Sequence, residues 1–205
     1  MNFASDNVTG AAPEILAAIE AGNTGALMPY GNDDVTRAAE AKAAALFETV
    51  AGVFFVATGT AANSLALSAT TPPWGAVFCH GGAHVFDTEL AAPEFYSGGA
   101  KLITLPGDNG KFKPETLETA IADAQVGNVH HVQPASVSIT QATETGSIYS
   151  LDEIAAIAKV CKAHGLKLHM DGARFSNAVA ALGCSAAEIS WKAGGDILSF
   201  GATKN

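Results

Sequence analysis

Short apolar runs alternate with helix-like segments along the chain, and this alternation limits the possible folds more than any other feature. The apolar runs are rich in β-branched and aromatic residues, as buried strands are. They predict strands at Val53–Ala57, Ala76–Cys79, Lys101–Leu105, Val129–Val137, Leu166–Met170 and Asp196–Phe200. The segments around them predict helices at Pro13–Ala21, Val35–Thr49, Ala61–Ala69, Pro114–Gln125, Leu151–His164, Arg174–Leu182 and Ala186–Lys192. Strands that alternate with helices indicate βαβ units, so we expect an α/β fold with a mainly parallel sheet between helices.

Local signals predict where several of these helices begin and end. Pro114 suits the first turn of a helix, where a missing N–H costs nothing. Ser150, followed three residues later by Glu153, predicts a capping box. Gly165, directly after His164, predicts a helix end closed by a glycine.

The length suits a single domain, residues 1–205, either of ordinary size or a large domain with part missing, and the composition disfavours several kinds of partner. Hydrophobic residues make up 48% of the 205 and charged residues 15%, which is enough apolar surface for a sizeable core. The net charge is −9, and the 11 Lys and Arg residues form no cluster, so we expect neither nucleic-acid nor membrane binding. No apolar run reaches the roughly 20 residues of a membrane span. Because Met1–Asp6 lacks a secretion signal, we expect a cytoplasmic protein.

The three cysteines do not form a recognisable functional pattern. Cys79, Cys161 and Cys184 are odd in number, widely spaced and free of any CxxC arrangement. This excludes a disulfide framework and a cysteine zinc site, and we expect no metal. All three lie in apolar stretches, which predicts buried, unreactive thiols.

Ligands of parallel sheets bind beyond the C-terminal ends of the strands, so residues that follow the predicted strands are the first candidates. Thr58–Asn63 follows Val53–Ala57 and opens a helix, where glycine, hydroxyls and free N–H groups can hold an anion. An ordinary turn capped by a threonine would have the same sequence. His84 follows another predicted strand and could stack on a flat ring or cap the next helix.

Three charged residues follow the last two predicted strands. Asp171 ends the run Leu166–Met170, and Arg174 comes three residues later. The guanidinium suits a substrate carboxylate, although a local salt bridge at a helix start explains the pair equally well. Lys204 follows Asp196–Phe200, and an ordinary surface lysine is the alternative there.

Together these four strand-end sites predict more than any one of them alone. A lysine amine forms a Schiff base with the aldehyde of pyridoxal phosphate, which suits Lys204. A carboxylate such as Asp171 keeps the pyridine nitrogen protonated, so that the ring can accept electrons. The turn Thr58–Asn63 would hold the phosphate and His84 would stack on the ring. The set predicts pyridoxal 5′-phosphate as the cofactor.

The chain also resembles a known family over its whole length. It is similar to the low-specificity L-threonine aldolases, within the β-eliminating lyases of aspartate-aminotransferase-like fold. The matching motifs are Ser5–Thr9 (S-D-x-V-T), Tyr30–Asp34 (Y-G-x-D/D), Thr58–Asn63 (T-G-T-x-A-N) and His169–Arg174 (H-x-D-G-A-R), with His84 and Lys204 at single matching positions. The resemblance implies the large domain of a fold type I enzyme, incomplete at its C-terminus, with the small C-terminal domain absent from this chain.

The resemblance also implies roles for individual residues. Gly59 and Thr60 would hold the cofactor phosphate, and Asp171 would pair with the pyridine nitrogen. His84 would stack on the ring, and Lys204 would carry the cofactor as a Schiff base.

Substrate binding is implied for three further positions. Arg174 and Ser5 would help to hold the carboxylate of the amino-acid substrate. Tyr30 would reach the site of a neighbouring subunit, because the sites of this family lie at a subunit interface. We therefore expect a homodimer or homotetramer with shared active sites.

The implied reaction is retro-aldol cleavage of L-threonine, L-allo-threonine or a related β-hydroxy amino acid to glycine and an aldehyde. Such an enzyme serves threonine catabolism and glycine biosynthesis. The chain departs from the family at Glu144, where many members have a second active-site histidine. His84 is therefore the first candidate to handle the β-hydroxyl proton, with Glu144 or an ordered water second. We expect His130 and His131 to be structural.

Three alternatives remain open from the sequence. One is another fold type I enzyme that eliminates at Cβ or decarboxylates, because the lysine and aspartate suit these reactions as well. Another is an inactive fragment of such an enzyme. A nucleotide-binding fold is disfavoured, since no G-x-G-x-x-G follows a predicted strand. Neither the preferred substrate nor the stereochemistry at Cβ follows from the residues.

Overall fold

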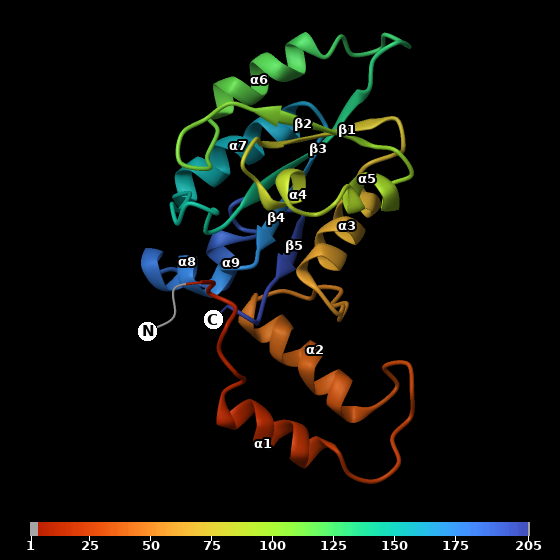
Figure 1. The fold of residues 1–205 in the computed structure, drawn as a ribbon, viewed down its shortest axis with the longest axis vertical. Helices are drawn as coiled ribbons and strands as arrows, with labels where there is room; N and C mark the ends of the chain where they lie inside the picture. Colours follow the sequence, from red (N-terminus) through yellow and green to blue (C-terminus); the bar gives the residue numbers. More distant parts are fainter. Residues whose placement is uncertain (1–3, 205) are drawn as a thin grey trace. The chain divides into compact units, whose positions relative to one another are not determined.

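The computed structural model describes residues 4–204, and these form two units. The first unit comprises the described residues up to Phe55 together with Lys204, and the second comprises Val56–Thr203. Figure 1 shows the elements of each unit, labelled in chain order. We describe each unit by itself.

The first unit contains two helices, α1 (Pro13–Gly22) and α2 (Asp34–Leu46), and no residue of either helix is buried. Asp33 caps α2, because its Oδ1 accepts the Thr36 N–H at 2.8 Å. Its Oδ2 accepts the Thr36 hydroxyl at 2.8 Å. These two hydrogen bonds, the backbone one first, lower the pKa of Asp33.

The second unit is built on one five-stranded parallel sheet with the order β2-β1-β3-β4-β5. The strands are β1 (Gly75–His80), β2 (Lys101–Leu105), β3 (Gln133–Thr140), β4 (Lys167–Gly172) and β5 (Ile197–Phe200). The helices are α3 (Gly59–Thr70), α4 (His84–Asp87), α5 (Ala92–Tyr96), α6 (Pro114–Asp123), α7 (Leu151–Ala163), α8 (Phe175–Leu182) and α9 (Ala186–Ile189). The predicted parallel sheet flanked by helices is confirmed (Figure 1).

The helices pack against the sheet in two groups. α3 packs on α5 and against β3, β4 and β5, while α6 packs on α7 and against β2. One core cluster lies beneath α3 and is formed by Leu67, Val77, Cys79, Ala83, Val85 and Leu102. Because parallel strands are covered on both faces, all of β1 except its last residue is buried.

Several predicted helix signals are confirmed. Pro114 occupies the first turn of α6. Ser150 and Glu153 form the capping box of α7. Gly165 has a φ of +69° just beyond the end of that helix, as a closing glycine does.

The predicted strand Val53–Ala57 is wrong, because this segment pairs with no strand in the described part of the chain. Phe54 and Phe55 are 88% and 71% exposed. A strand forms only where a neighbouring strand can pair with its backbone N–H and C=O groups. An apolar run in the sequence shows that the side chains are hydrophobic, but it does not show whether such a neighbour exists.

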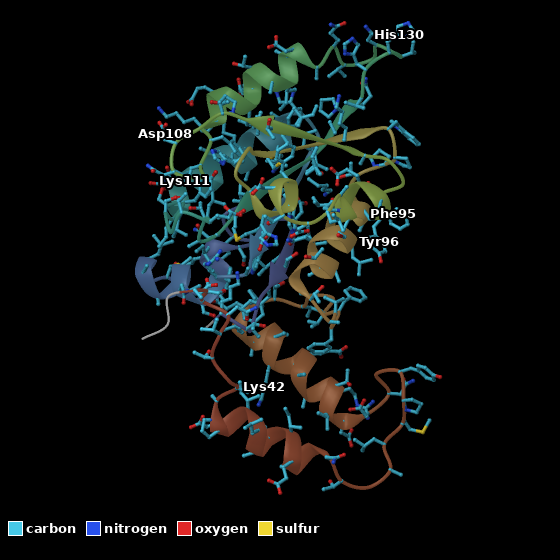
Figure 2. All side chains as sticks on the ribbon, viewed as in Figure 1. Lys42, Phe95, Tyr96, Asp108, Lys111 and His130 are labelled. Atoms are coloured by element: carbon cyan, nitrogen blue, oxygen red, sulfur yellow. The ribbon has the colours of Figure 1, made fainter. Side chains whose placement is uncertain are left out.

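The bounds of two predicted strands also change by more than one residue. β3 begins at Gln133 rather than Val129 and continues to Thr140, so His130 and His131 lie in an exposed turn before it (Figure 2). The predicted start of this strand, at Val129, is therefore wrong, and both histidines lie before the strand. β4 extends to Gly172, which places Asp171 inside the strand rather than beyond it.

Two helices escaped prediction, because α4 and α5 have four and five residues and are too short to show a helical period. Phe95 and Tyr96 at the end of α5 form an edge-to-face pair on the surface (Figure 2). No helix within residues 4–204 has both the length and the apolar character needed to cross a bilayer.

The cysteines are mostly as expected. Cys79 and Cys161 are buried, and desolvation raises the pKa of each thiol to about 12. Cys184 is only half-buried, which corrects the expectation that all three are buried. Its pKa is also raised, again chiefly by desolvation, so none of the three is a ready thiolate.

Candidate active site

Polar side chains converge in the second unit near the C-terminal ends of β3 and β4. They come from α3, the start of α4, the loop after α4, and the ends of these two strands (Figure 1). The sheet produces this convergence because all its strands run in the same direction and end at one edge. We call the linked residues Asn63, His84, Glu89 and Asp171 the polar cluster.

Asp171 provides a buried carboxylate near the end of β4. It is 3% exposed, and its Oδ1 accepts the Ala173 N–H at 3.0 Å. Its Oδ2 accepts an N–H from the Asn63 amide at 2.9 Å. Each oxygen keeps further lone pairs, so the carboxylate can accept another donor such as a protonated ring nitrogen.

His84 is held at both its backbone and its ring. Its backbone N–H donates to Glu144 Oε1 at 2.7 Å. Its ring Nδ1 lies 2.7 Å from Glu89 Oε1. The His84 side chain is 45% exposed whereas that of Glu89 is fully buried, so one edge of the imidazole is anchored and the rest is accessible.

Asn63 joins the two halves of the cluster. Its Nδ2 donates to Glu89 Oε1 at 2.8 Å and to Asp171 Oδ2 at 2.9 Å. One amide therefore bridges two buried carboxylates that are far apart in sequence. The structure thus brings His84 and Asp171, predicted separately, into a single hydrogen-bonded network.

Glu89 and the bridging role of Asn63 were missed by sequence reasoning. The sequence did mark Asn63 as a candidate, since it ends the motif Thr58–Asn63, but no role was predicted for its side chain. The sequence did not mark Glu89, because nothing in the neighbouring residues distinguishes a buried glutamate from a solvated one. Only the fold shows that its side chain points inward.

Glu144 lies beside this network, at the start of the turn after β3. Its Oε1 accepts both the His84 N–H and the Thr140 hydroxyl, the latter at 3.1 Å. Its Oε2 is buried and has no hydrogen-bond partner among the described residues. Glu144, the second candidate for the β-hydroxyl proton, therefore lies next to His84 in the structure.

The turn before α3 shows the geometry of a capped helix start. The Thr58 hydroxyl accepts the Ala61 N–H at 3.1 Å. Gly59 and Thr60 form the first turn, where backbone N–H groups have no intrahelical acceptor. A Cβ atom on Gly59 would meet nothing within 4 Å, so open space lies beside these N–H groups. The Thr58 cap is therefore compatible with the prediction that this turn binds an anion.

His169 lies two residues before Asp171 on β4 and is completely buried. Its Nδ1 lies 2.9 Å from Ser138 Oγ on β3, and its Nε2 lies 2.9 Å from Ser199 Oγ on β5. Desolvation lowers the pKa of His169 to about 4, although the nearby Asp171 acts in the opposite direction. The imidazole is therefore neutral and links three strands.

Arg174 begins the turn into α8 as its N-cap residue and is half-buried. It follows Ala173, whose N–H donates to the Asp171 carboxylate, so Arg174 lies just beyond the end of β4 and Asp171 lies within it. Gly172 lets β4 and β5 approach closely, because a Cβ there would lie 2.8 Å from Leu198 Cδ1.

Ser5, Tyr30 and Lys204 belong to the first unit. The Lys204 ammonium lies 3.5 Å from the Asp6 carboxylate, next to Ser5, whose hydroxyl accepts the Asn7 N–H at 3.1 Å. Tyr30 is 96% exposed and has a φ of +64°, in the left-handed region. The Tyr30 side chain is therefore accessible to solvent over almost its whole surface.

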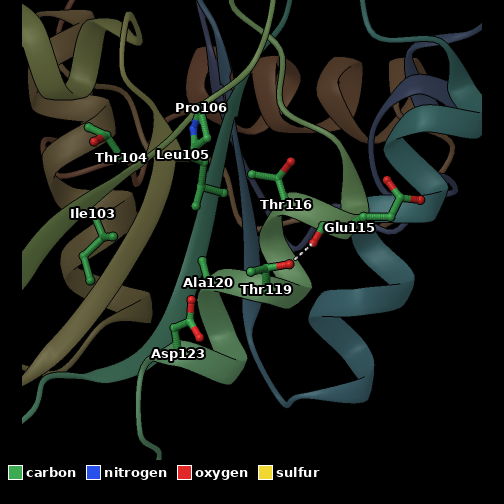
Figure 3. Close-up of a pocket in the computed structure, with 9 residues that line it drawn as sticks. All are labelled: Ile103, Thr104, Leu105, Pro106, Glu115, Thr116, Thr119, Ala120 and Asp123. Carbon is green, nitrogen blue, oxygen red and sulfur yellow. Dashed lines mark hydrogen bonds between the residues drawn. The ribbon is translucent and has the colours of Figure 1, made fainter.

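A hollow of about 460 Å³ between β2 and α6 contains none of the predicted site residues (Figure 3). Its wall includes the carboxylates of Glu115 and Asp123 and no basic side chain. It therefore does not suit a phosphate. No group of three metal-binding side chains occurs within residues 4–204.

The residues of the second unit fit pyridoxal phosphate. Asn63 Oδ1, Glu89 Oε2 and Glu144 Oε2 are buried without a hydrogen-bond partner among the described residues. Orphaned buried acceptors around a carboxylate suit a ligand with a protonated ring nitrogen and polar substituents. The open first turn of α3 suits its phosphate.

Comparisons with known proteins agree with this fit. A family model described as "Beta-eliminating lyase" matches residues 2–205. A "Low specificity L-threonine aldolase" from a Pseudomonas species is 50% identical over 203 residues, which cover 99% of this chain and 58% of that protein. The protein of the same name from Pseudomonas aeruginosa is 49% identical over the same shares of both chains.

A solved structure of a Leishmania major threonine aldolase superposes with a TM-score of 0.83 and 31% identity. The match covers 90% of this chain and 54% of that one. It confirms the predicted fold class, an α/β large domain of fold type I. The chain spans little more than half the length of the relatives it matches.

Proposed function

Because the chain belongs to the beta-eliminating lyase family, we propose that it is the cofactor-binding part of a pyridoxal-phosphate-dependent threonine aldolase. The reaction is cleavage of L-threonine or L-allo-threonine to glycine and acetaldehyde. The observation that carries the proposal is the polar cluster, in which a buried Asp171 carboxylate and the accessible imidazole of His84 share one hydrogen-bonded network. The names of the Pseudomonas relatives support the same reaction.

Five residues of this chain would hold the cofactor in this proposal. Asp171 would accept a hydrogen bond from the protonated pyridine nitrogen, and the turn at Gly59 and Thr60 would hold the phosphate. His84 would stack on the ring, and Lys204 would attach the cofactor covalently. When bound, pyridoxal phosphate supplies a conjugated ring that accepts the electron pair left on Cα.

His84 manages the proton of the substrate's β-hydroxyl. It accepts that proton at its accessible ring edge as the Cα–Cβ bond breaks and the aldehyde leaves. Glu144, whose Oε2 is buried without a partner among the described residues, is the second candidate for this proton. Arg174 and Ser5 orient the substrate carboxylate, and Arg174 does so through its planar fork.

Assembly and physiological role are further parts of the proposal. Tyr30, which is almost fully exposed, contributes to the site of a neighbouring subunit in a homodimer or homotetramer. The enzyme acts in threonine catabolism and glycine biosynthesis.

The proposal is tested by measuring products from L-threonine with the natural full-length polypeptide and pyridoxal phosphate. We expect acetaldehyde and glycine in equal amounts, and loss of turnover in Asp171→Ala with the fold retained by circular dichroism. Release of ammonia and a 2-oxo acid instead would show an eliminating lyase and overturn the aldolase assignment. Wild-type activity of Asp171→Ala would overturn the role of Asp171.

The attachment site needs a separate measurement. Borohydride reduction followed by peptide mass spectrometry is expected to place the cofactor on Lys204. Lys42, an exposed lysine of α2, provides the control, since Lys42→Ala is expected to retain the reduced adduct. An adduct that survives in Lys204→Ala would contradict the assignment.

A further inference from the structure

Glu89 is a buried carboxylate, and its hydrogen-bond partners within residues 4–204 are His84 and Asn63 of the polar cluster. Its side chain is fully buried, and its Oε1 lies 2.7 Å from His84 Nδ1 and accepts the Asn63 amide at 2.8 Å. Burial of a carboxylate is unfavourable unless it is paired and hydrogen-bonded. The contacts of Glu89 Oε1 with His84 and Asn63 are therefore what allow this side chain to be buried.

The backbone after Glu89 is also unusual. Leu90 and Ala91 have φ values of +51° and +57°, and both are in the left-handed region that disfavours residues with a Cβ. Leu90 is completely exposed, whereas the preceding Glu89 side chain is fully buried. This strained turn directs the acid inward and leaves an apolar side chain in solvent.

The hydrogen-bond pattern determines which ring nitrogen of His84 carries a proton. Glu89 Oε1 already accepts an N–H from Asn63, so it acts as an acceptor toward Nδ1 as well. A neutral imidazole has one N–H, and Nδ1 donates it to Glu89. Nε2 therefore keeps its lone pair, and that is the nitrogen state a general base needs.

We propose that Glu89 and Asn63 are positioning residues of this site, an inference that rests on the proposed aldolase function. Glu89 fixes His84 in the tautomer whose Nε2 accepts the β-hydroxyl proton. Asn63 holds Glu89 and Asp171 through a single amide, so that the imidazole and the pyridine-binding carboxylate are oriented together.

The tautomer of His84 is measured directly by NMR of the natural full-length polypeptide, free of cofactor and labelled with ¹⁵N in its histidine rings. Long-range ¹H–¹⁵N correlations distinguish a protonated ring nitrogen from one with a lone pair, and the signals lost in His84→Asn identify His84. We expect protonated Nδ1 and unprotonated Nε2 in the wild type. The opposite tautomer in the wild type would overturn the proposal without any variant.

Glu89→Gln tests whether the carboxylate imposes this state. The glutamine can turn its NH₂ toward Nδ1, so we expect a Nε2-protonated population to appear. We also expect kcat/KM for L-threonine to fall by at least ~10-fold, since a base in the wrong tautomer cannot accept the proton. An unchanged tautomer and rate in Glu89→Gln would contradict the inference.

Glu94→Gln is the matched control. Glu94 follows five residues later and also has a buried oxygen without a partner among the described residues, but no hydrogen bond to His84 is found for it. Its variant is expected to keep the wild-type tautomer and kcat/KM. An equal effect in both variants would show that loss of any buried carboxylate is responsible, and would overturn the specific role of Glu89.

Asn63→Ala separates the two positioning roles. This variant is expected to mix the tautomers of His84 and also to weaken binding of pyridoxal phosphate, because Asp171 loses a donor. Glu89→Gln is expected to bind the cofactor nearly as well as wild type. Cofactor affinity unchanged in Asn63→Ala would overturn the bridging role. If the wild type shows the expected His84 tautomer but releases no acetaldehyde from L-threonine, the proposed function is overturned, whereas the role of Glu89 in fixing the tautomer is not.

Discussion

At the scale of the residue, two ionisable side chains lie two positions apart on the same strand. Asp171 accepts the Ala173 N–H at one carboxylate oxygen and an Asn63 amide N–H at the other. His169, two residues earlier on the same face, lies between the hydroxyls of Ser138 and Ser199. A hydroxyl can donate or accept, so the two serines satisfy a neutral imidazole without any charge.

The neutral state of His169 predicts how stability depends on pH. The pKa of a histidine in the unfolded chain is about 6.5, whereas burial lowers the pKa of His169 in the folded protein to about 4. Between these values the unfolded state binds the extra proton, so the free energy of unfolding falls as the pH falls from 6.5 to 4. The loss attributable to this residue is about 3 kcal/mol at most.

Urea unfolding of wild type and His169→Gln across this pH range checks the prediction. Glutamine offers a donor and an acceptor to the two serines but does not titrate, so the variant should show a shallower pH dependence. His130→Gln, at an exposed histidine, is the control and should keep the wild-type dependence. Equal slopes for His169→Gln and wild type would contradict the neutral state.

At the scale of the element, capping determines where the helices begin. The capping box of α7 pairs the Ser150 hydroxyl with the Glu153 N–H and the Glu153 carboxylate with the Ser150 N–H. Desolvation acts to raise the pKa of Glu153. The Lys111 ammonium, 2.7 Å from that carboxylate, and the Ser150 hydrogen bonds together outweigh it and lower the pKa. The start of α7 is thus tied to the loop before α6.

Ser150→Ala should lower the free energy of unfolding by about 1 kcal/mol, because the N–H of Glu153 loses its acceptor. Chemical denaturation measures the change. Ser150→Thr, which keeps the hydroxyl, should lose much less. Equal losses in the two variants would show that the capping hydroxyl is not the cause.

Local capping signals explain why several helix boundaries were predicted correctly from the sequence. The capping box at Ser150, the proline of α6 and the glycine after α7 are local signals, and each is confirmed. Val53–Ala57 failed because strand pairing depends on residues far along the chain. Asp171 was placed beyond its strand because the sequence pattern does not show where the ladder with β5 stops.

At the scale of the whole molecule, the buried polar cluster makes cofactor binding and folding interdependent. Asn63 on α3 and Asp171 on β4 meet only when the second unit is folded. A ligand that binds Asp171 and the start of α3 therefore binds the folded state alone. Linkage then stabilises the protein by RT ln(1 + [L]/Kd).

Pyridoxal phosphate should therefore raise the free energy of unfolding of the natural full-length polypeptide, by about 2.7 kcal/mol at 100 times its Kd. Thermal unfolding with increasing cofactor measures the effect. Pyridoxine, which lacks the phosphate and the aldehyde, should give a much smaller shift. An equal shift with both compounds would show that neither group is recognised.

Local patterns in the sequence predicted the alternation of elements, the parallel sheet and most candidate site residues. These patterns are the apolar period, the capping residues and the motifs at Thr58–Asn63 and His169–Arg174. The burial of Glu89 and its link through Asn63 to Asp171 became visible only in the folded chain. This is because a hydrogen bond between distant residues depends on where the sheet brings the chain together. A glutamate in a loop has the same sequence signature whether it points into the core or into water.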